Sequence, residues 1–310
     1  MTATRSARLV GAALCAALAL VIVVWLLRDL AVFGPSDGLL RVWLGDGDAV
    51  GHDFPATSLV DPLLLVAYTA AAVMSLRSPL AAPVFTAVGV LTIALRLPGL
   101  WAAGTETLVT TVLSLGLATG LVVTAAAGRR VDRLGESGTA RRPRRGPSTA
   151  AGVLCVVAGL ALTGWELRLA QLLPSEFTVA RFTGARTVLL STLAVPPGWL
   201  NAVLVLLLLT AAGLAFARAR STRPLGLAAG LLLAGYGITG VAAVLRPAWY
   251  VAVPTPVLTT GPYELTALYA LLAGVAVLVL LGGTWRPRPS PYRASPGLPP
   301  APPAHRPPGW

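Results

Sequence analysis

The sequence predicts an all-α integral membrane protein with eight transmembrane helices, arranged as two parallel four-helix repeats and followed by a disordered, Pro-rich C-terminal tail. Three observations predict this fold. The chain of 310 residues is 55% hydrophobic and only 12% charged, which is too much apolar surface for a water-soluble core with a charged exterior. Eight apolar runs are long enough to cross a hydrocarbon core of about 30 Å. Finally, one apolar phrase containing Cys, Trp and Leu-Arg is written twice, at a spacing of 140 residues.

The eight apolar runs lie at 9–27, 59–76, 80–97, 107–127, 150–167, 199–217, 224–245 and 263–283. Because every backbone amide in lipid needs a partner within the chain, each run is expected to be an α-helix. The second and third runs are separated by Arg77, Ser78 and Pro79, a turn signal that predicts a helical hairpin. The first run follows two arginines, as the core of a signal peptide does, but it is longer than such a core. We therefore expect it to remain as a membrane helix.

The two halves of the chain resemble each other, at an offset of 140 residues in their first helices and with small insertions later. Aligning the first run with the fifth gives identical residues at Leu14/Leu154, Cys15/Cys155, Leu20/Leu160, Trp25/Trp165, Leu27/Leu167 and Arg28/Arg168. Because each half has four crossings, both halves enter and leave on the same side, and the repeats are expected to be parallel. The alternative is a chance alignment of Ala- and Leu-rich helices, against which the Cys and Trp matches weigh.

Four domains follow from this pattern: a first four-helix membrane repeat at 1–127, an Arg-rich cytoplasmic linker at 128–148, a second four-helix membrane repeat at 149–284, and a Pro-rich cytoplasmic tail at 285–310. Besides the lipid bilayer itself, the expected partner is anionic lipid at the inner face, which the linker would contact. The tail is expected to be disordered or polyproline-like. Docking of a protein partner on the linker or the tail is the alternative.

The arginines predict the orientation. With the N-terminus inside, 17 of the 24 basic residues but only two of the 12 carboxylates fall on the inner side, as cytoplasmic loops require. Both termini are therefore expected to be cytoplasmic. All basic residues are Arg, which together with the excess of Ala, Gly, Leu and Val suggests a GC-rich bacterial genome and a multi-pass protein of the plasma membrane. Because the charge lies between apolar runs, no nucleic-acid partner is expected.

Each half brings a similar polar set to the outer boundary. The residues Arg28, Asp61, Arg96 and Glu106 of the first half correspond to Arg168, Asn201, Arg246 and Glu264 of the second. If they form one outer-facing ligand site, the arginines and glutamates should converge on a cleft between the halves, since a charge at depth needs a partner or water. The alternative is that they pair within each half and cap helix ends.

Other outer features predict anchoring and packing. The short apolar stretches GLLRVWL from Gly38 and RTVLLSTLAV from Arg186 are expected to be amphipathic helices in the interface. Six tryptophans near the outer boundary are expected to anchor in the headgroup region, with a substrate surface as the alternative; they are Trp25, Trp43, Trp101, Trp165, Trp199 and Trp249. Small residues four apart predict close helix packing at Gly116 and Gly120, and at Gly226 and Gly230.

The apolar runs contain few residues of the types that catalyse reactions or bind metals. The only histidines are His52 and His305, both outside the apolar runs, so no His-based metal site or nucleophile is expected within the membrane. Cys15 and Cys155 have no basic neighbour and are expected to be apolar packing residues. The central thirds of the runs contain no ionisable Asp, Glu, Lys, Arg or His, the usual members of a proton relay. We expect no metal, no cofactor and no catalytic residue.

One acidic stretch, WLGDGDAVGHDFP from Trp43, contains side chains of the types that bind metal ions or act as a base. Its aspartates and His52 are of the type that binds a divalent cation, but the spacing lacks the closing Glu of an EF-hand loop. The loop also resembles the first outer loop of polyprenol-phosphate-dependent glycosyltransferases, and this resemblance implies an Asp that serves as a base. It covers only this loop, and the second outer loop lacks the aspartates. An ordinary solvated turn is the favoured interpretation.

Three functions are consistent with these features. The first is a non-catalytic assembly or partner subunit, favoured by the plain helices and the interaction-prone inner segments. The second is a transporter or permease for a small or amphipathic solute, favoured by the repeats and disfavoured by the lack of polar residues at the membrane midplane. The third is an outer-face, lipid-dependent transferase that would rest on Asp46, Asp48 and Asp61.

Overall fold

The computed structural model describes residues 2–34, 38–46, 54–77, 81–102, 104–130, 145–185, 189–219, 221–246 and 261–283. Its helices are α1 (Arg5–Phe33), α2 (Gly38–Trp43), α3 (Val60–Arg77), α4 (Ala81–Arg96), α5 (Gly99–Ala102), α6 (Thr105–Ala127), α7 (Arg145–Leu172), α8 (Ser175–Thr183), α9 (Pro197–Phe216), α10 (Thr222–Leu245) and α12 (Gly261–Gly282). Two short strands, β1 (Thr2–Ala3) and β2 (Arg129–Arg130), pair antiparallel. The described chain is therefore all-α apart from one minimal strand pair.

Seven helical segments of the described chain are long and apolar enough to cross a membrane, which makes this a multi-pass membrane protein. They are α1, α4 together with α5, α6, α7, α9, α10 and α12. The eighth apolar helix, α3, is shorter, with its apolar part at Val60–Leu76. Helices α1 and α7 have 29 and 28 residues, which at 1.5 Å per residue is roughly 42 Å. They extend past the predicted runs 9–27 and 150–167, so both reach beyond the hydrocarbon core.

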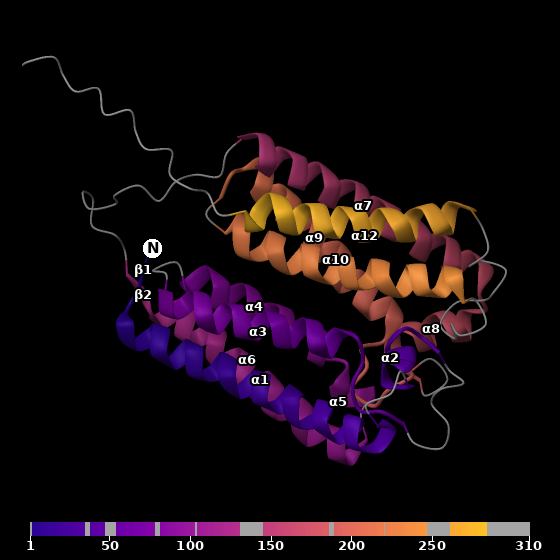
Figure 1. Ribbon diagram of the computed structural model, residues 1–310, viewed down its shortest axis with the longest axis horizontal. Coiled ribbons are helices and arrows are strands. Elements are labelled where there is room, and N and C mark those ends of the chain that lie inside the picture. Colours follow the sequence, from indigo (N-terminus) through magenta and orange to yellow (C-terminus); the bar gives the residue numbers. More distant parts are fainter. Residues whose placement is uncertain are drawn as a thin grey trace, which may run out of the picture.

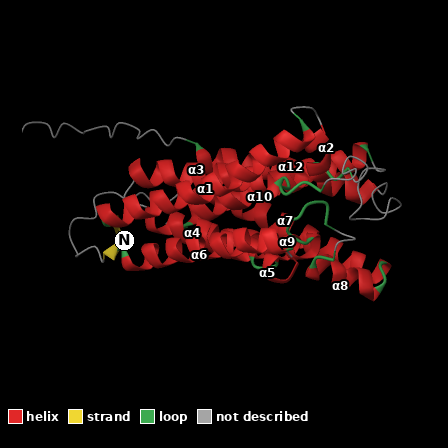
Figure 2. Cartoon of the chain, turned by 90° about the horizontal axis from the view of Figure 1, so that it is seen from below, coloured by secondary structure: helices red, strands yellow, loops and turns green. Residues whose placement is uncertain are grey.

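The long helices run side by side along the long axis of the molecule (Figures 1 and 2), and they form two groups (Figure 1). The first helix group contains α1, α3, α4 and α6, and the second contains α7, α9, α10 and α12. In the first group, α1 packs against α3 and α6, and α4 packs against α6. In the second group, α7 packs against α9 and α12, and α10 packs against α12. The order of neighbours is the same in both groups.

The two groups share one hydrophobic core. It includes Cys15, Tyr68 and Phe85 from the first group and Cys155 and Leu208 from the second. Both cysteines are free and buried, so they lie where apolar packing residues are expected. The groups meet mainly through α10, which packs against both α3 and α4.

The end of the predicted linker is displaced. The prediction placed residues up to 148 in the linker, but Arg145–Ser148 form the first turn of α7. Pro147 is tolerated there because the first turn of a helix has no internal partner for its backbone N–H groups. The Ser148 hydroxyl donates to the carbonyl of Ala215 at 2.7 Å and ties this turn to α9. Most of the predicted linker, 131–144, and the whole of the predicted tail lie outside the described residues.

The loops that were predicted to be external differ in part from the prediction. The stretch from Gly38 forms a helix, α2, as expected. The prediction of an amphipathic helix from Arg186 is wrong for its described part, because residues 189–195 are not helical. The helix of this loop is α8 instead, which Gly184 ends in the left-handed conformation at φ 84°. Residues Leu189, Ser191, Leu193 and Val195 are buried, so this stretch lies inside the protein rather than in the interface.

Glycine contacts confirm one packing prediction and contradict another. A Cβ at Gly226 would overlap Leu281 on α12, and a Cβ at Gly230 would lie 3.1 Å from the Gly274 carbonyl. The predicted close approach of α10 is therefore confirmed. Gly116 has no neighbour within 4 Å, and Gly120 meets only Leu14 at ordinary contact distance. The prediction for α6 is wrong, because the Gly116 face points away from the core.

The same substitution should have opposite effects at two glycines. A Cβ at Gly237 would overlap the backbone of Leu271 on α12, and backbone atoms cannot rotate away. We expect Gly237→Ala to lower the free energy of unfolding in detergent by about 1–3 kcal/mol through overpacking. Gly116→Ala should leave it unchanged or raise it by up to about 1 kcal/mol, because Ala favours the helix and restricts the unfolded chain. Equal changes in the two variants would contradict the packing of α10 against α12.

Candidate functional site

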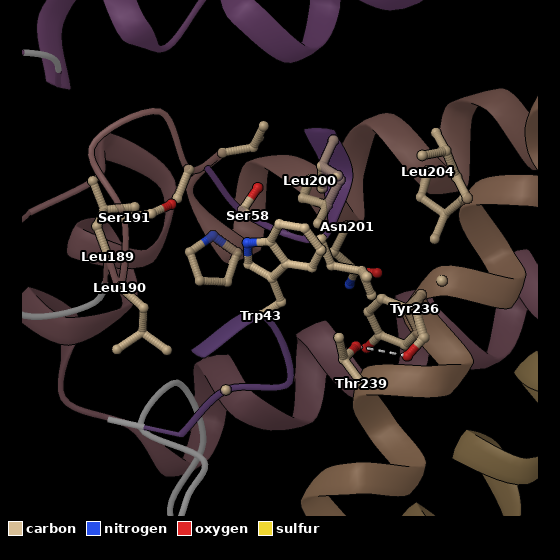
Figure 3. A pocket seen from close by; sticks show the side chains of 18 of the residues that line it. Trp43, Ser58, Leu189, Leu190, Ser191, Leu200, Asn201, Leu204, Tyr236 and Thr239 are labelled. Carbon is tan, nitrogen blue, oxygen red and sulfur yellow. Dashed lines mark hydrogen bonds between the residues drawn. The ribbon is translucent and has the colours of Figure 1, made fainter. Parts of the chain in front are cut away.

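A cavity of about 180 Å³ lies between the two helix groups near the ends of α9 and α7. The first half of the chain contributes the end of α2, residues 57–60 and Leu63. The second contributes residues of α7, α8, α9, α10 and α12, together with the buried stretch 189–197. In Figure 3 the indole of Trp43 occupies the middle of the view, with Leu189 and Ser191 to one side and Tyr236 to the other.

The deeper walls of the cavity are apolar. Leu63 comes from α3, Leu200 and Leu204 from α9, and Leu232 and Gly235 from α10. Leu204 is the eighth residue of α9, about 10 Å along the helix at 1.5 Å per residue. Leu232 lies near the middle of α10. The cavity therefore reaches from the loops toward the interior of the membrane.

One end of the cavity is polar and consists of Glu166 on α7, Arg181 on α8 and Asn201 on α9. Arg181 Nη2 lies 3.2 Å from each carboxylate oxygen of Glu166. The Arg181 side chain is 5% exposed and that of Glu166 is 20% exposed, so the ion pair is largely withdrawn from solvent. The two charges neutralise each other, which makes this end of the cavity polar but without net charge.

Asn201 completes the set with an acceptor that it does not use within the described chain. Its Nδ2 donates to Glu166 Oε2 at 2.9 Å and to the carbonyl of Leu162 at 3.3 Å. These two acceptors fix which side of the amide is nitrogen. Asn201 is only 4% exposed, and its Oδ1 accepts no hydrogen bond from any described residue. The hydroxyl of Ser191, at 2% exposure, also has no hydrogen-bond partner among the described residues.

Local sequence explains how these groups meet. Pro196 and Pro197 start α9, where Pro is well suited because its φ matches the first turn of a helix. Asn201 then falls in the second turn. Leu162 and Glu166 are four apart on α7 and so lie on one face, which Asn201 contacts through both of them.

A hydrogen-bonded seam joins the two helix groups beside the cavity. The backbone N–H groups of Thr192 and Leu193 donate to the carbonyls of Pro55 and Ala56 at 3.1 and 2.9 Å. Arg96 Nη1, from α4, donates to the Leu193 carbonyl at 3.1 Å. The buried stretch of the second group is thus bonded to the first group along its backbone.

Two buried carboxylates anchor this seam in the first group. Asp29 of α1 accepts hydrogen bonds from the backbone N–H groups of Ala56 and Thr57 at 3.0 and 2.7 Å, and from the Thr57 hydroxyl at 2.6 Å. Asp61 of α3 pairs with Arg96 and accepts from the Ser58 N–H at 2.7 Å. Both carboxylates are almost fully buried, so their charges depend on these donors.

Two indole N–H groups make further hydrogen bonds between the two halves of the chain. Trp199 donates to the carbonyl of Ala94 at 2.7 Å, and Trp101 donates to the carbonyl of Thr183 at 3.0 Å. The two rings meet edge to face, with centroids 5.9 Å apart. Since each bond links the two groups, these tryptophans hold the protein together rather than only anchoring it in lipid headgroups. Trp249 lies outside the described residues.

Three of the predicted site residues lie in the seam or line the cavity. Asp61 and Arg96 pair in the seam, and Asn201 lines the cavity. The guanidinium of Arg28 lies 4.9 Å from the Trp25 ring centroid, and that of Arg168 lies 5.3 Å from that of Trp165. These arginines belong to α1 and α7, which lie on opposite sides of the molecule (Figure 1), so they do not converge.

The remaining predicted residues lie elsewhere. Arg246 and Glu264 are exposed at the ends of α10 and α12. Glu106 is in the first turn of α6, and its side chain is outside the described part of the structure. Arg28 lines a second cavity, of about 360 Å³, which shares Ser191 with the first.

Sequence comparison of the halves missed Glu166, Arg181 and Ser191. Glu166 stands directly after Trp165 in the repeated phrase, where the first copy has Leu26 after Trp25. A carboxylate within the apolar phrase, at a position where the other half has leucine, is the signal that would have found it. Arg181 does match Arg41 at the same offset, but only the structure shows that it is buried.

In the acidic stretch, the one aspartate that the structure describes is paired. Asp46 is fully buried and lies 2.7 Å from Arg41 Nη2. Asp48, His52 and Asp53 lie outside the described residues. Within the described ranges no group of three or more His, Cys, Asp or Glu side chains is arranged to hold a metal ion.

No protein-family model matches the chain, and neither does any curated protein or solved structure. What the cavity can bind therefore follows from its own chemistry. Apolar walls with one buried polar end suit a molecule that has an apolar part and a small polar group. The apolar part then contacts the apolar walls, and the polar group contacts the polar side chains.

Removing one member of the Asp61–Arg96 pair should be far more damaging than removing both. Asp61→Leu leaves a buried guanidinium without its countercharge, which we expect to cost about 3–5 kcal/mol of unfolding free energy. The double variant Asp61→Leu/Arg96→Met should cost clearly less than Asp61→Leu. Arg28→Met, at an exposed arginine, should stay within about 0.5 kcal/mol. Denaturant unfolding in detergent measures all three, and a double variant that is as unstable as Asp61→Leu, or less stable, would argue against a coupled pair.

Proposed function

We propose that this chain is an eight-span protein of a bacterial plasma membrane, built as two parallel four-helix repeats, that binds a small amphipathic molecule between them. The observation that carries the proposal is the cavity, with leucine walls at depth and the Glu166–Arg181–Asn201 set at one end. A binding role is consistent with a non-catalytic subunit, the first of the three functions suggested by the sequence.

Matching contacts support the repeat. Trp25 Nε1 on α1 donates to the Thr110 hydroxyl on α6 at 3.2 Å. Trp165 Nε1 on α7 donates to the Thr266 hydroxyl on α12 at 2.9 Å. In both groups the first helix is thus bonded to the last by the same pair of residue types, and an arginine three positions later lies over the indole. The order in which the helices pack is also the same.

An eighth span by α3 has physical support. Its apolar part, Val60–Leu76, is at the lower limit of about 17 residues for a membrane helix. It packs against α1 and α4, both long and apolar, and Asp61 at its start is neutralised by Arg96. The first group then crosses four times, which agrees with the pairing of β1 at the start of the chain with β2 after α6.

The arginine distribution supports an inner position for both termini. The Arg-rich linker would then lie against anionic lipid, as its charge favours, and the cavity would face outward. A topology reporter inserted at Gly138 should be cytoplasmic, and one at Gly47 should be external. An external reporter at Gly138 would refute this orientation and the outward direction of the cavity with it.

The cavity is of a size that suits part of an amphiphile. An engineered cavity of about 150 Å³ is known to bind benzene, so about 180 Å³ is enough for a short stretch of alkyl chain with a small head. Of the described residues that line it, only Glu166 and Arg181 are charged, and they neutralise each other.

Transport is the second candidate. The observation in its favour is that the cavity extends to Leu232, near the middle of α10, as a path across the membrane would. Uptake of an amphiphile into vesicles that contain the protein would distinguish transport from binding. The transferase is less well supported, because Asp46 and Asp61 are both buried in ion pairs and so are poorly placed to serve as a base.

Filling the cavity should abolish binding. Decanol that carries a photoreactive diazirine on its chain should label lining residues of the detergent-solubilised protein, and unlabelled decanol should compete. Leu204→Trp places a large ring in the cavity and should reduce this labelling at least about tenfold. Leu206→Trp is the matched control, because Leu206 lies on the same helix and is 66% exposed. Equal labelling of both variants, mapped by mass spectrometry, would contradict the proposal.

A further inference from the structure

We infer that Asn201 selects the head of the bound molecule, and that this head is an uncharged group that donates a hydrogen bond, a hydroxyl or an amide N–H. The inference rests on the proposed function, since it requires that a ligand enters the cavity. It goes further in naming the chemistry that the cavity recognises and the atom that recognises it, Asn201 Oδ1.

The side-chain amide of Asn201 is fixed in one orientation. Both hydrogens of Asn201 Nδ2 are directed to acceptors, Glu166 Oε2 and the Leu162 carbonyl. Oδ1 is therefore fixed on the other side, and an amide oxygen can only accept. A buried acceptor that stays unbonded costs about as much as a lost hydrogen bond, so a ligand that supplies a donor gains from satisfying it.

The charges at the polar end of the cavity are paired with each other. Glu166 already accepts two hydrogen bonds from Arg181 and one from Asn201, which uses most of its capacity as an acceptor. Arg181 in turn is directed at Glu166. No other charged side chain among the described residues lines the cavity. A charged head would enter this partly buried site without a countercharge, and an uncharged head avoids that desolvation cost.

Ser191 brings a second polar group to the cavity. Its hydroxyl lines the same cavity, is 2% exposed and has no hydrogen-bond partner in the described chain. A hydroxyl can donate and accept, so it suits a second polar atom on the ligand. Thr239 differs: it also lines the cavity, but its hydroxyl donates to the Tyr236 carbonyl of its own helix at 2.9 Å, as the dashed line in Figure 3 shows.

The shared chemistry is a hydroxyl on an alkyl chain, and it has two sources. One is a membrane lipid with a neutral hydroxylated head, such as a monoacylglycerol. The other is a free long-chain alcohol from the aqueous phase. Both would place the hydroxyl at Asn201 and the chain along Leu63, Leu204 and Leu232.

The test compares two diazirine probes that differ by one donor, decanol and decyl methyl ether, on the intact protein. The alcohol should bind about tenfold more tightly than the ether, because only the alcohol can donate to Asn201 Oδ1. Asn201→Leu should bring the alcohol to the affinity of the ether and leave the ether unchanged. Thr239→Val is the matched control and should keep the preference. Ser191→Ala, which breaks no hydrogen bond of the described chain, should reduce it severalfold.

The outcomes separate this inference from the proposed function. If neither probe labels the cavity, the proposed function fails. If both label it with equal affinity, the cavity binds amphiphiles and the inference is wrong. A preference that survives Asn201→Leu would also overturn it. Should Asn201→Leu fail to fold, the comparison of the two probes on the unaltered protein and on Ser191→Ala still decides. Competition by monooleoylglycerol in nanodiscs, against decanol added from water, identifies the source.

Discussion

The hydrogen-bonded seam between residues 55–57 and 191–193 is the interaction on which the rest of the structure depends. Asp29 holds one side of it to α1, and Arg96 holds the other side to α4 and, through Asp61, to α3. These groups are almost fully buried inside the protein, where bulk water does not satisfy them, so the chain must pair them itself. The carboxylates find their partners within the first half of the chain, but the N–H groups of Thr192 and Leu193 and one nitrogen of Arg96 are bonded only when the two helix groups lie together.

The cavity is a consequence of how the groups are joined. At the seam the connection is made by irregular chain and side chains, which do not fill space as closely as helices packed directly on one another. In the wall of the cavity, Gly235 lets α10 approach Leu63 of α3 so closely that a Cβ would overlap that side chain. The space between the groups is therefore bounded on one side by this close packing and on another by the seam. Within it, the Glu166–Arg181–Asn201 set provides a polar end without net charge.

Much of the fold could be predicted because apolar runs in lipid have few structural options. Every predicted run became a helix, while the ends shifted where the first turn of α7 recruited Arg145 and Pro147. The burial of the stretch 189–195 could not be predicted. Its backbone N–H groups bond to the carbonyl groups of residues 55 and 56, which are far away in the chain. Packing was predictable only in part: small residues four apart mark a close contact on α10 but not on α6, since the pattern does not say which face meets a neighbour.

The candidate site was predictable to the extent that its residues recur in both halves. Asp61, Arg96 and Asn201 were found by that criterion. Yet the structure does not use them equivalently, because Asp61 pairs with an arginine and Asn201 with a glutamate. Glu166 has no counterpart in the first half, so a comparison based on repetition excluded the residue that orients Asn201. The residues that make the site specific are those in which the two halves differ.

The central claim is that the two helix groups, joined at the seam, enclose a site for an amphipathic molecule. An electron cryomicroscopy map of the chain in lipid nanodiscs tests this most directly. The account predicts elongated non-protein density between Leu63 and Leu204, with its polar end within hydrogen-bonding distance of Asn201 Oδ1. Leu204 packed directly against Leu63, with Asn201 Oδ1 bonded to a donor of the protein itself, would contradict it.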